Sequence, residues 1–123
     1  MEFEYPIGYL EISDFDEQTG LLKGELSQKP VLVMIQASYC GACTKSKPEF
    51  QKLANNGMFN VMTIQLDGKK DTERQISNLL NKIIPGVNTI PAYVFFYKNN
   101  IFAYTGLSRT SLDLQQFVKT YLI

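Results

Sequence analysis

Apolar residues fall into short runs that are typical of β-strands. Residues 31–36 are apolar at almost every position, as in a strand buried on both faces of a sheet with parallel neighbours. Residues 61–66 alternate between polar and apolar side chains, and residues 92–97 form a third run. A polar turn at 98–100 then predicts a hairpin that joins 92–97 to an antiparallel strand at 101–105.

Three further segments have the spacing of helices. Residues 44–53 predict the first helix, which Pro48 should kink because proline removes an internal hydrogen bond. Asp71 is the expected N-cap of the second helix, and Thr110 with Asp113 resembles a capping box at the start of the last. The side chains expected to be buried by these two helices are Ile76, Leu79, Leu80 and Ile83 in one and Leu114, Phe117, Val118 and Tyr121 in the other.

Residues 1–30 allow two interpretations. Residues 9–12 alternate weakly and predict an edge strand. Residues 13–26 then form either a helix, which two glycines would weaken by about 1 kcal/mol each, or a hairpin that turns at 18–20. The pattern does not separate these alternatives.

The order of the elements after residue 30 defines the class of fold. Strand, helix, strand, helix, strand, strand and helix follow one another. A βαβ unit followed by a hairpin and a covering helix predicts an α/β protein with a mixed central sheet and helices on both faces. We expect residues 1–123 to form a single domain.

Composition and charge exclude several kinds of function. Twelve basic and twelve acidic residues balance, so the chain lacks the positive charge expected of a protein that binds nucleic acid or an anionic membrane. The longest apolar run, at 90–97, is too short to span a bilayer. The first residues lack the features of a secretory signal, and we therefore expect a cytoplasmic protein.

The two cysteines of the chain, Cys40 and Cys43, lie where the first buried strand meets the first helix. A helix N-terminus offers unpaired N–H groups and a partial positive charge, both of which stabilise a thiolate. Cys40 should therefore be the more acidic and more exposed sulfur, and Cys43, one turn into the helix, the more buried one. This asymmetry suits a redox centre in which one sulfur attacks and the other resolves.

Two other roles for the cysteine pair are less well supported. A structural zinc site needs four Cys or His ligands and a catalytic site usually three, whereas the chain has two cysteines and no histidine. A metal could bind only by recruiting carboxylates or a second chain, so we expect neither a metal nor another cofactor. A purely structural disulfide across so short a loop would contribute only about 2 kcal/mol. Such a bond is also kept reduced inside cells.

From residue 31 to the end, the chain resembles the thioredoxin family. Residues 39–43 are similar to the active-site segment of that family, and Pro48 matches the proline of its active-site helix. Residues 89–91 resemble its Ile-Pro dipeptide, whose proline is cis and faces the cysteines. The turn at 98–100 and Gly106 fall at matching positions. The resemblance implies a thioredoxin-like fold.

Several positions depart from the family pattern. Tyr39 replaces the tryptophan before the first cysteine, and Ala42 replaces the proline between the cysteines. Met34 and Thr63 stand where many thioredoxins have a buried acid and its lysine partner. No buried carboxylate is then available to accept the proton of Cys43. We expect these departures to favour the dithiol and to make the reduction potential less negative than the roughly −270 mV of thioredoxin.

The resemblance implies a thiol–disulfide oxidoreductase in which Cys40 attacks and Cys43 resolves. It implies monomers that act on protein disulfides, with thioredoxin reductase as a candidate electron donor. Lys45 and Lys47 are expected on the solvated face of the helix. A glutathione-dependent, glutaredoxin-like enzyme and a non-catalytic adaptor remain alternatives, although the chain lacks a Gly-Gly-Asp-like segment and keeps both cysteines. The residues expected to contact substrate are Tyr39, Gly41, Ala42, Ile90 and Pro91.

Overall fold

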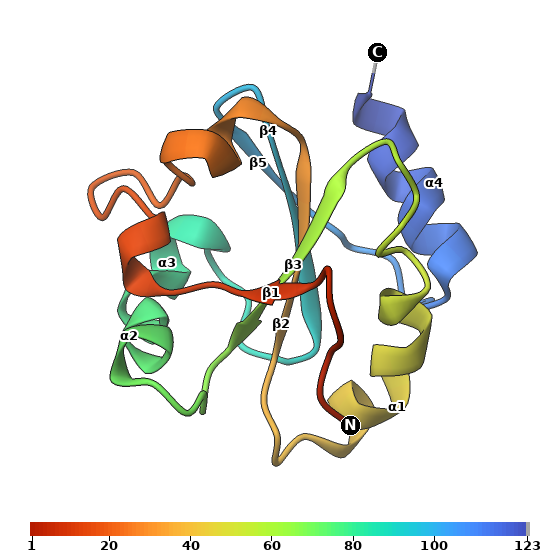
Figure 1. The fold of residues 1–123 in the computed structure, drawn as a ribbon, viewed down its shortest axis with the longest axis horizontal. Coiled ribbons are helices and arrows are strands. Elements are labelled where there is room, and N and C mark those ends of the chain that lie inside the picture. The colour runs from red at the N-terminus through yellow and green to blue at the C-terminus, as the bar shows by residue number, and fades with distance from the viewer. Residues whose placement is uncertain (123) are drawn as a thin grey trace.

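One mixed sheet forms the centre of the protein in the computed structural model, which describes residues 1–122 (Figure 1). Its strand order is β1-β3-β2-β4-β5. The first three of these strands are parallel, whereas β4 runs antiparallel to both β2 and β5. The strands span Gly8–Tyr9 (β1), Val31–Gln36 (β2), Asn60–Gln65 (β3), Ala92–Tyr97 (β4) and Asn100–Ala103 (β5).

Helices cover both faces of this sheet (Figure 1). On one face lie α1 (Gly41–Gln51) and α4 (Ser111–Tyr121). On the other lie α2 (Asp71–Arg74) and α3 (Leu80–Ile83), joined by a 3₁₀ turn at Gln75–Leu79. The fold is the expected thioredoxin-like α/β arrangement. No helix of residues 1–122 is long and apolar enough to cross a membrane.

The central strand β2 explains why the protein has two apolar cores. Leu32 and Met34 face the core under α1 and α4, whereas Val33 and Ile35 face the core under α2 and α3. Every residue of β2 is buried, as its continuous apolar run predicts. The last residue of the strand, Gln36, is polar and equally buried.

The N-terminal segment adopts the hairpin rather than the helix. Phe15 and Leu22 form an antiparallel bridge, and Gly20, with a φ of 78°, turns the chain between them. The Asp16 carboxylate accepts the backbone N–H of Gln18 at 2.9 Å, which satisfies a donor that a helix would otherwise bond internally. Of the two alternatives for residues 13–26, the hairpin is therefore confirmed and the helix is wrong.

The second predicted helix is also different in detail. Lys70, and not Asp71, is the N-cap, and the segment is divided into α2, the 3₁₀ turn and α3. The predicted stripe nevertheless packs inwards: Ile76, Leu79 and Ile83 are buried, and Leu80 is half-buried. The apolar pattern thus identified the inner face of this segment but not its hydrogen bonding.

The last two elements follow the prediction closely. Lys98 and Asn99 both have positive φ, as a tight hairpin turn requires, and β5 already begins at Asn100. Thr110 is the N-cap of α4, and its hydroxyl accepts the backbone N–H of Asp113 at 3.2 Å. On the inner face of α4, Leu114 and Val118 are buried and Phe117 and Tyr121 are half-buried.

Candidate active site

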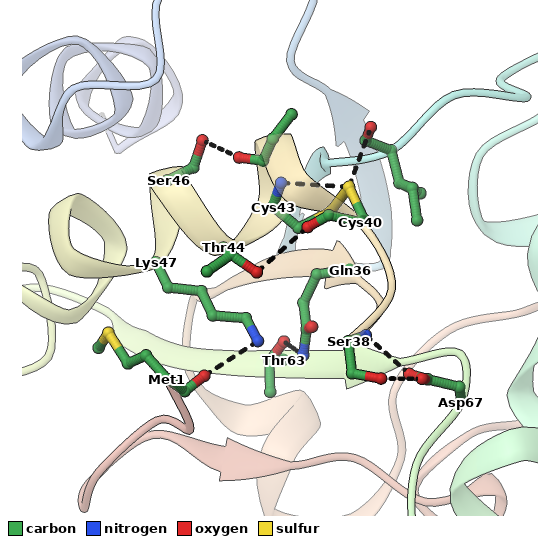
Figure 2. Close-up of a disulfide and its surroundings, with 12 residues drawn as sticks. Met1, Gln36, Ser38, Cys40, Cys43, Thr44, Ser46, Lys47, Thr63 and Asp67 are labelled. Carbon is green, nitrogen blue, oxygen red and sulfur yellow. Dashed lines mark hydrogen bonds between the residues drawn. A yellow bond between two sulfur atoms is a disulfide. The ribbon is translucent and has the colours of Figure 1, made fainter.

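The two cysteines lie at the start of α1, directly after the buried strand β2 (Figure 2). Cys40 is the N-cap of the helix and has an extended backbone, and Cys43 lies in the first turn. The two sulfurs form a disulfide, with the Cα atoms 5.2 Å apart. The helix begins at Gly41, three residues earlier than the apolar pattern predicts.

The two sulfurs differ in exposure as predicted. Cys43 is completely buried, whereas Cys40 is half-buried. The Cys40 Sγ accepts the backbone N–H of Cys43 at 3.1 Å. In the reduced protein the same N–H and the positive end of α1 would stabilise a thiolate on Cys40. The geometry therefore favours Cys40 as the nucleophile.

The loop before β4 lies against the exposed side of the disulfide. The carbonyl oxygen of Ile90 is 3.7 Å from the Cys40 Sγ, and the Ile90–Pro91 peptide bond is cis, as the family resemblance implies. Pro91 is buried and Ile90 is half-buried. The structure thus brings Cys40, Ile90 and Pro91 together, and the substrate contacts of the last two remain predictions.

The other predicted contact residues surround the cysteines on the surface. Tyr39 is 74% exposed, and Gly41 and Ala42 are exposed as well. A cavity of about 190 Å³ opens beside Tyr39 and Ile90. Its apolar lining includes Leu66, Leu80, Ile84 and Val87, which sequence reasoning did not connect with the site.

Beneath α1, the positions of the missing acid and lysine are occupied by an uncharged pair. Met34 is fully buried and lies in register with Thr63 on the neighbouring strand. The Thr63 hydroxyl donates to the backbone carbonyl of Met34 at 2.8 Å. The layer between the sheet and the active-site helix therefore contains no carboxylate at these two positions.

Gln36 adds a buried amide to this layer, which the sequence reasoning missed. Its Nε2 donates to the Thr63 Oγ1 at 3.2 Å (Figure 2). Because the Thr63 hydroxyl proton is already bonded to Met34, Oγ1 can only accept here, which fixes the orientation of the Gln36 amide. Its Oε1 has no hydrogen-bond partner among the described residues. A polar residue at the end of an apolar run was the available signal.

Lys47 is not on the solvated face of α1, so that expectation is wrong. It is 4% exposed, and its Nζ donates to the backbone carbonyl of Met1 at 3.1 Å. The ammonium also lies 5.8 Å from the centre of the Phe3 ring. The N-terminal segment covers this side of the helix and buries the lysine. Lys45, in contrast, is exposed as expected.

Two titratable groups near the site are perturbed. The Ser38 hydroxyl donates to the Asp67 carboxylate and lowers its pKa, and the Ser38 backbone N–H adds a second bond at 2.9 Å. On β4, burial raises the pKa of Tyr93, whose hydroxyl has no hydrogen-bond partner among the described residues. Asp67 therefore carries a negative charge beside the loop that precedes Cys40, and Tyr93 stays neutral.

Comparisons with known proteins agree with this geometry. The family model described as Thioredoxin matches residues 10–120. A thioredoxin-like protein, 453L, of Invertebrate iridescent virus 6 is 37% identical over 76% of this chain and 78% of its own length. Thioredoxin F from spinach chloroplast superposes with a TM-score of 0.64 at 16% identity, over 93% of this chain and 91% of that one. The J-Trx1 fragment of ERdj5 gives 0.68 at 18% identity, over 94% of this chain, which spans 51% of the fragment.

Metal ligands do not gather at the site. Within residues 1–122, no group of three or more His, Cys, Asp or Glu side chains is arranged to hold a metal ion.

Proposed function

Because the chain belongs to the thioredoxin family, we propose that it is a thiol–disulfide oxidoreductase that exchanges disulfides with protein substrates through Cys40 and Cys43. The single observation that carries this proposal is the unequal exposure of the two sulfurs at a helix N-terminus. A purely structural disulfide has no need of such an arrangement. A redox centre needs one accessible sulfur and one that is protected until the first exchange has occurred.

The reaction proceeds in two exchanges. The Cys40 thiolate attacks one sulfur of the substrate disulfide, the substrate S–S bond breaks, and the leaving substrate thiolate takes up a proton. Cys43 loses its proton and attacks Cys40, which breaks the mixed disulfide and releases the second substrate thiol. The substrate gains two electrons, and the Cys40–Cys43 disulfide is then reduced by an external dithiol donor, for which thioredoxin reductase is the candidate.

The surface around Cys40 suits an extended peptide. The Ile90 carbonyl beside the Cys40 Sγ offers a backbone acceptor to a substrate strand. The exposed Tyr39 ring and the apolar cavity of about 190 Å³ next to it suit an apolar side chain that flanks the substrate cysteine. These features support proteins, rather than small disulfides alone, as substrates.

Trapping of mixed disulfides tests this assignment. Cys43→Ser should accumulate mixed disulfides on Cys40, because the resolving sulfur is absent. Cys40→Ser, the matched control, should accumulate almost none, because its remaining sulfur is buried. Trapping mainly in Cys40→Ser would reverse the roles of the two cysteines.

A second assay identifies the electron donor. The wild type is given a protein disulfide together with dithiothreitol, with thioredoxin reductase and its reductant, or with glutathione. Turnover with the first two supports the proposal. Turnover with glutathione alone would instead indicate a glutaredoxin-like enzyme, and a lack of turnover with all three would indicate an adaptor.

A further inference from the structure

Lys47 places a positive charge in the buried layer beneath α1, where the N-terminal segment packs against the helix. The side chain is 4% exposed and runs from α1 to the Met1 carbonyl (Figure 2). That carbonyl and the Phe3 ring are its observed partners. No carboxylate forms an ion pair with Lys47 among the described residues. A buried ammonium with one carbonyl partner is incompletely compensated for its lost hydration.

The same layer contains the resolving cysteine. Cys43 and Lys47 are four residues apart on α1, so their Cβ atoms lie on one face of the helix, about 5–6 Å apart. Phe50 continues this face, and all three residues are buried. Across from them, Met34 and Thr63 supply no negative charge. The disulfide therefore shares a poorly hydrated layer with a cation that forms no ion pair among the described residues.

The N-terminal segment holds the ammonium in place. The backbone N–H of Glu4 donates to the Gln51 Oε1 at 2.9 Å, and the Gln51 Nε2 donates back to the Glu4 carbonyl at 3.3 Å. Phe3, between these contacts and Met1, packs edge-on against Phe50 at a centroid distance of 5.6 Å. The segment is thus fixed along α1 with the Met1 carbonyl directed at Lys47.

We propose that Lys47 is a positioning residue of the redox centre, whose buried charge stabilises the thiolate forms of Cys40 and Cys43 and makes their disulfide easier to reduce. The disulfide is uncharged, whereas the dithiol produced by two electrons and two protons can release a proton and become an anion. A cation in a poorly hydrated layer interacts only with the anion. This inference deepens the proposed function, but it requires only that the cysteine pair can be oxidised and reduced.

Other charged and titratable groups do not replace Lys47. Asp67 lies beside the Ser38 loop and acts in the opposite direction. Glu49 turns away to Lys52 and to the backbone N–H of Ser111 at the start of α4, and these bonds lower its pKa. Burial raises the pKa of the two tyrosines that face this layer, so neither carries charge near neutral pH. These tyrosines are Tyr9 on β1 and Tyr93 on β4. The positive charge of Arg109, in the segment before α4, lowers the pKa of Tyr93 by less than burial raises it.

Substitution of Lys47 tests the inference, with Lys45 as a matched control on the exposed side of the same helix. Lys47→Met removes the charge and keeps the length of the side chain, and Lys47→Arg keeps the charge. Two properties are measured on the reduced and equilibrated proteins: the pH dependence of Cys40 alkylation by iodoacetamide, and the equilibrium constant with reduced and oxidised glutathione.

We expect Lys47→Met to move the alkylation profile to higher pH and to shift the glutathione equilibrium towards the disulfide by about threefold to about tenfold. A tenfold shift corresponds to about 30 mV. Lys47→Arg should remain near the wild type. Lys45→Met should change the equilibrium by less than about twofold, and added salt should abolish that change but not the effect of Lys47→Met, because buried charges are screened less.

Three results would overturn the inference. In the first, Lys47→Met has the alkylation profile and the equilibrium of the wild type. In the second, Lys45→Met shifts the alkylation profile and the glutathione equilibrium as far as Lys47→Met does. In the third, Lys47→Arg behaves like Lys47→Met although its near-ultraviolet circular dichroism shows a native fold. If Lys47→Arg does not fold, the salt dependence of Lys47→Met tests the inference instead. An effect of Lys47→Met that added salt abolishes would then overturn it. A wild type that lacks turnover but shows the Lys47 shift would contradict the proposed function and leave this inference intact.

Discussion

Replacing Met34 by aspartate introduces a carboxyl group into the layer beneath the active-site helix. Met34 is fully buried, with Thr63 in register on one side and Tyr93 on the other. The Thr63 hydroxyl proton is already bonded to the Met34 carbonyl, so this neighbour cannot donate to the new group without losing that bond. Met34→Asn is the matched control, since it has almost the same shape and no charge.

The magnitude follows from the burial. A fully buried carboxyl group has its pKa raised by as much as about 3–5 units above an unfolded value of about 3.9. Because the folded pKa is raised, the cost is absent below pH 4 and grows by about 1.4 kcal/mol per pH unit until the folded pKa is reached. With a folded pKa above 7, Met34→Asp would lose about 4 kcal/mol at pH 7 relative to Met34→Asn.

Urea unfolding of the two oxidised variants between about pH 4 and pH 8 measures this difference. Met34→Asn should show the pH dependence of the wild type, whereas the free energy of unfolding of Met34→Asp should fall steadily as the pH rises. If the buried Lys47 ammonium partly compensates the new carboxylate, the free energy of unfolding of Met34→Asp will fall less as the pH rises. Adding Lys47→Met to Met34→Asp would then restore the full fall. Parallel pH curves for Met34→Asp and Met34→Asn would refute the reasoning, because the position would then be hydrated.

Two further outcomes are expected. Equilibration of the wild type with glutathione should give a potential less negative than about −270 mV, because no buried carboxylate opposes the thiolates; a midpoint at or below that value would show that Met34 and Ala42 do not determine it. Gln36→Leu should lower the free energy of unfolding by less than about 1 kcal/mol, or raise it, because the Oε1 of Gln36 has no partner among the described residues. A loss above about 2 kcal/mol in urea unfolding would mean that the whole amide is satisfied in solution.

The strands and the last helix, α4, could be predicted because the sequence signals that specify them are local. Every residue of β2 is buried between two layers, so the run at 31–36 is apolar throughout. The turn at Lys98 and Asn99 fixes the β4–β5 hairpin within a few residues. In α4, the Thr110 cap and the buried Leu114 and Val118 fall at helical spacing. In each case the residues that determine the element are close together in the sequence.

The segment after β3 shows a limit of such patterns. A stripe at i, i+3, i+4 and i+7 specifies which face is buried, but i→i+3 and i→i+4 hydrogen bonds both keep that face inward over a few turns. Ile76, Leu79 and Ile83 are accordingly buried, although the backbone passes from α2 through a 3₁₀ turn to α3. At the start of this segment, the Arg74 side chain bonds the carbonyls of Gly68 and Lys69 at 2.7 and 2.9 Å, a contact that no periodicity contains.

The charge of the layer beneath the cysteines could not be predicted from the sequence pattern, for a different reason. A lysine within a helix is ordinarily assigned to solvent, and the residues that bury Lys47 are Met1 and Phe3, more than forty positions earlier. The family resemblance concerns Met34 and Thr63 on the strands, where the loss of an acid and of a lysine leaves the layer uncharged. Lys47 then adds a positive charge from the helix, so the layer favours thiolates more strongly than the strand positions alone imply. Two proteins with this fold can therefore differ in the sign of the charge beneath the same cysteine pair, and superposition at 16–18% identity carries no information about their redox potentials.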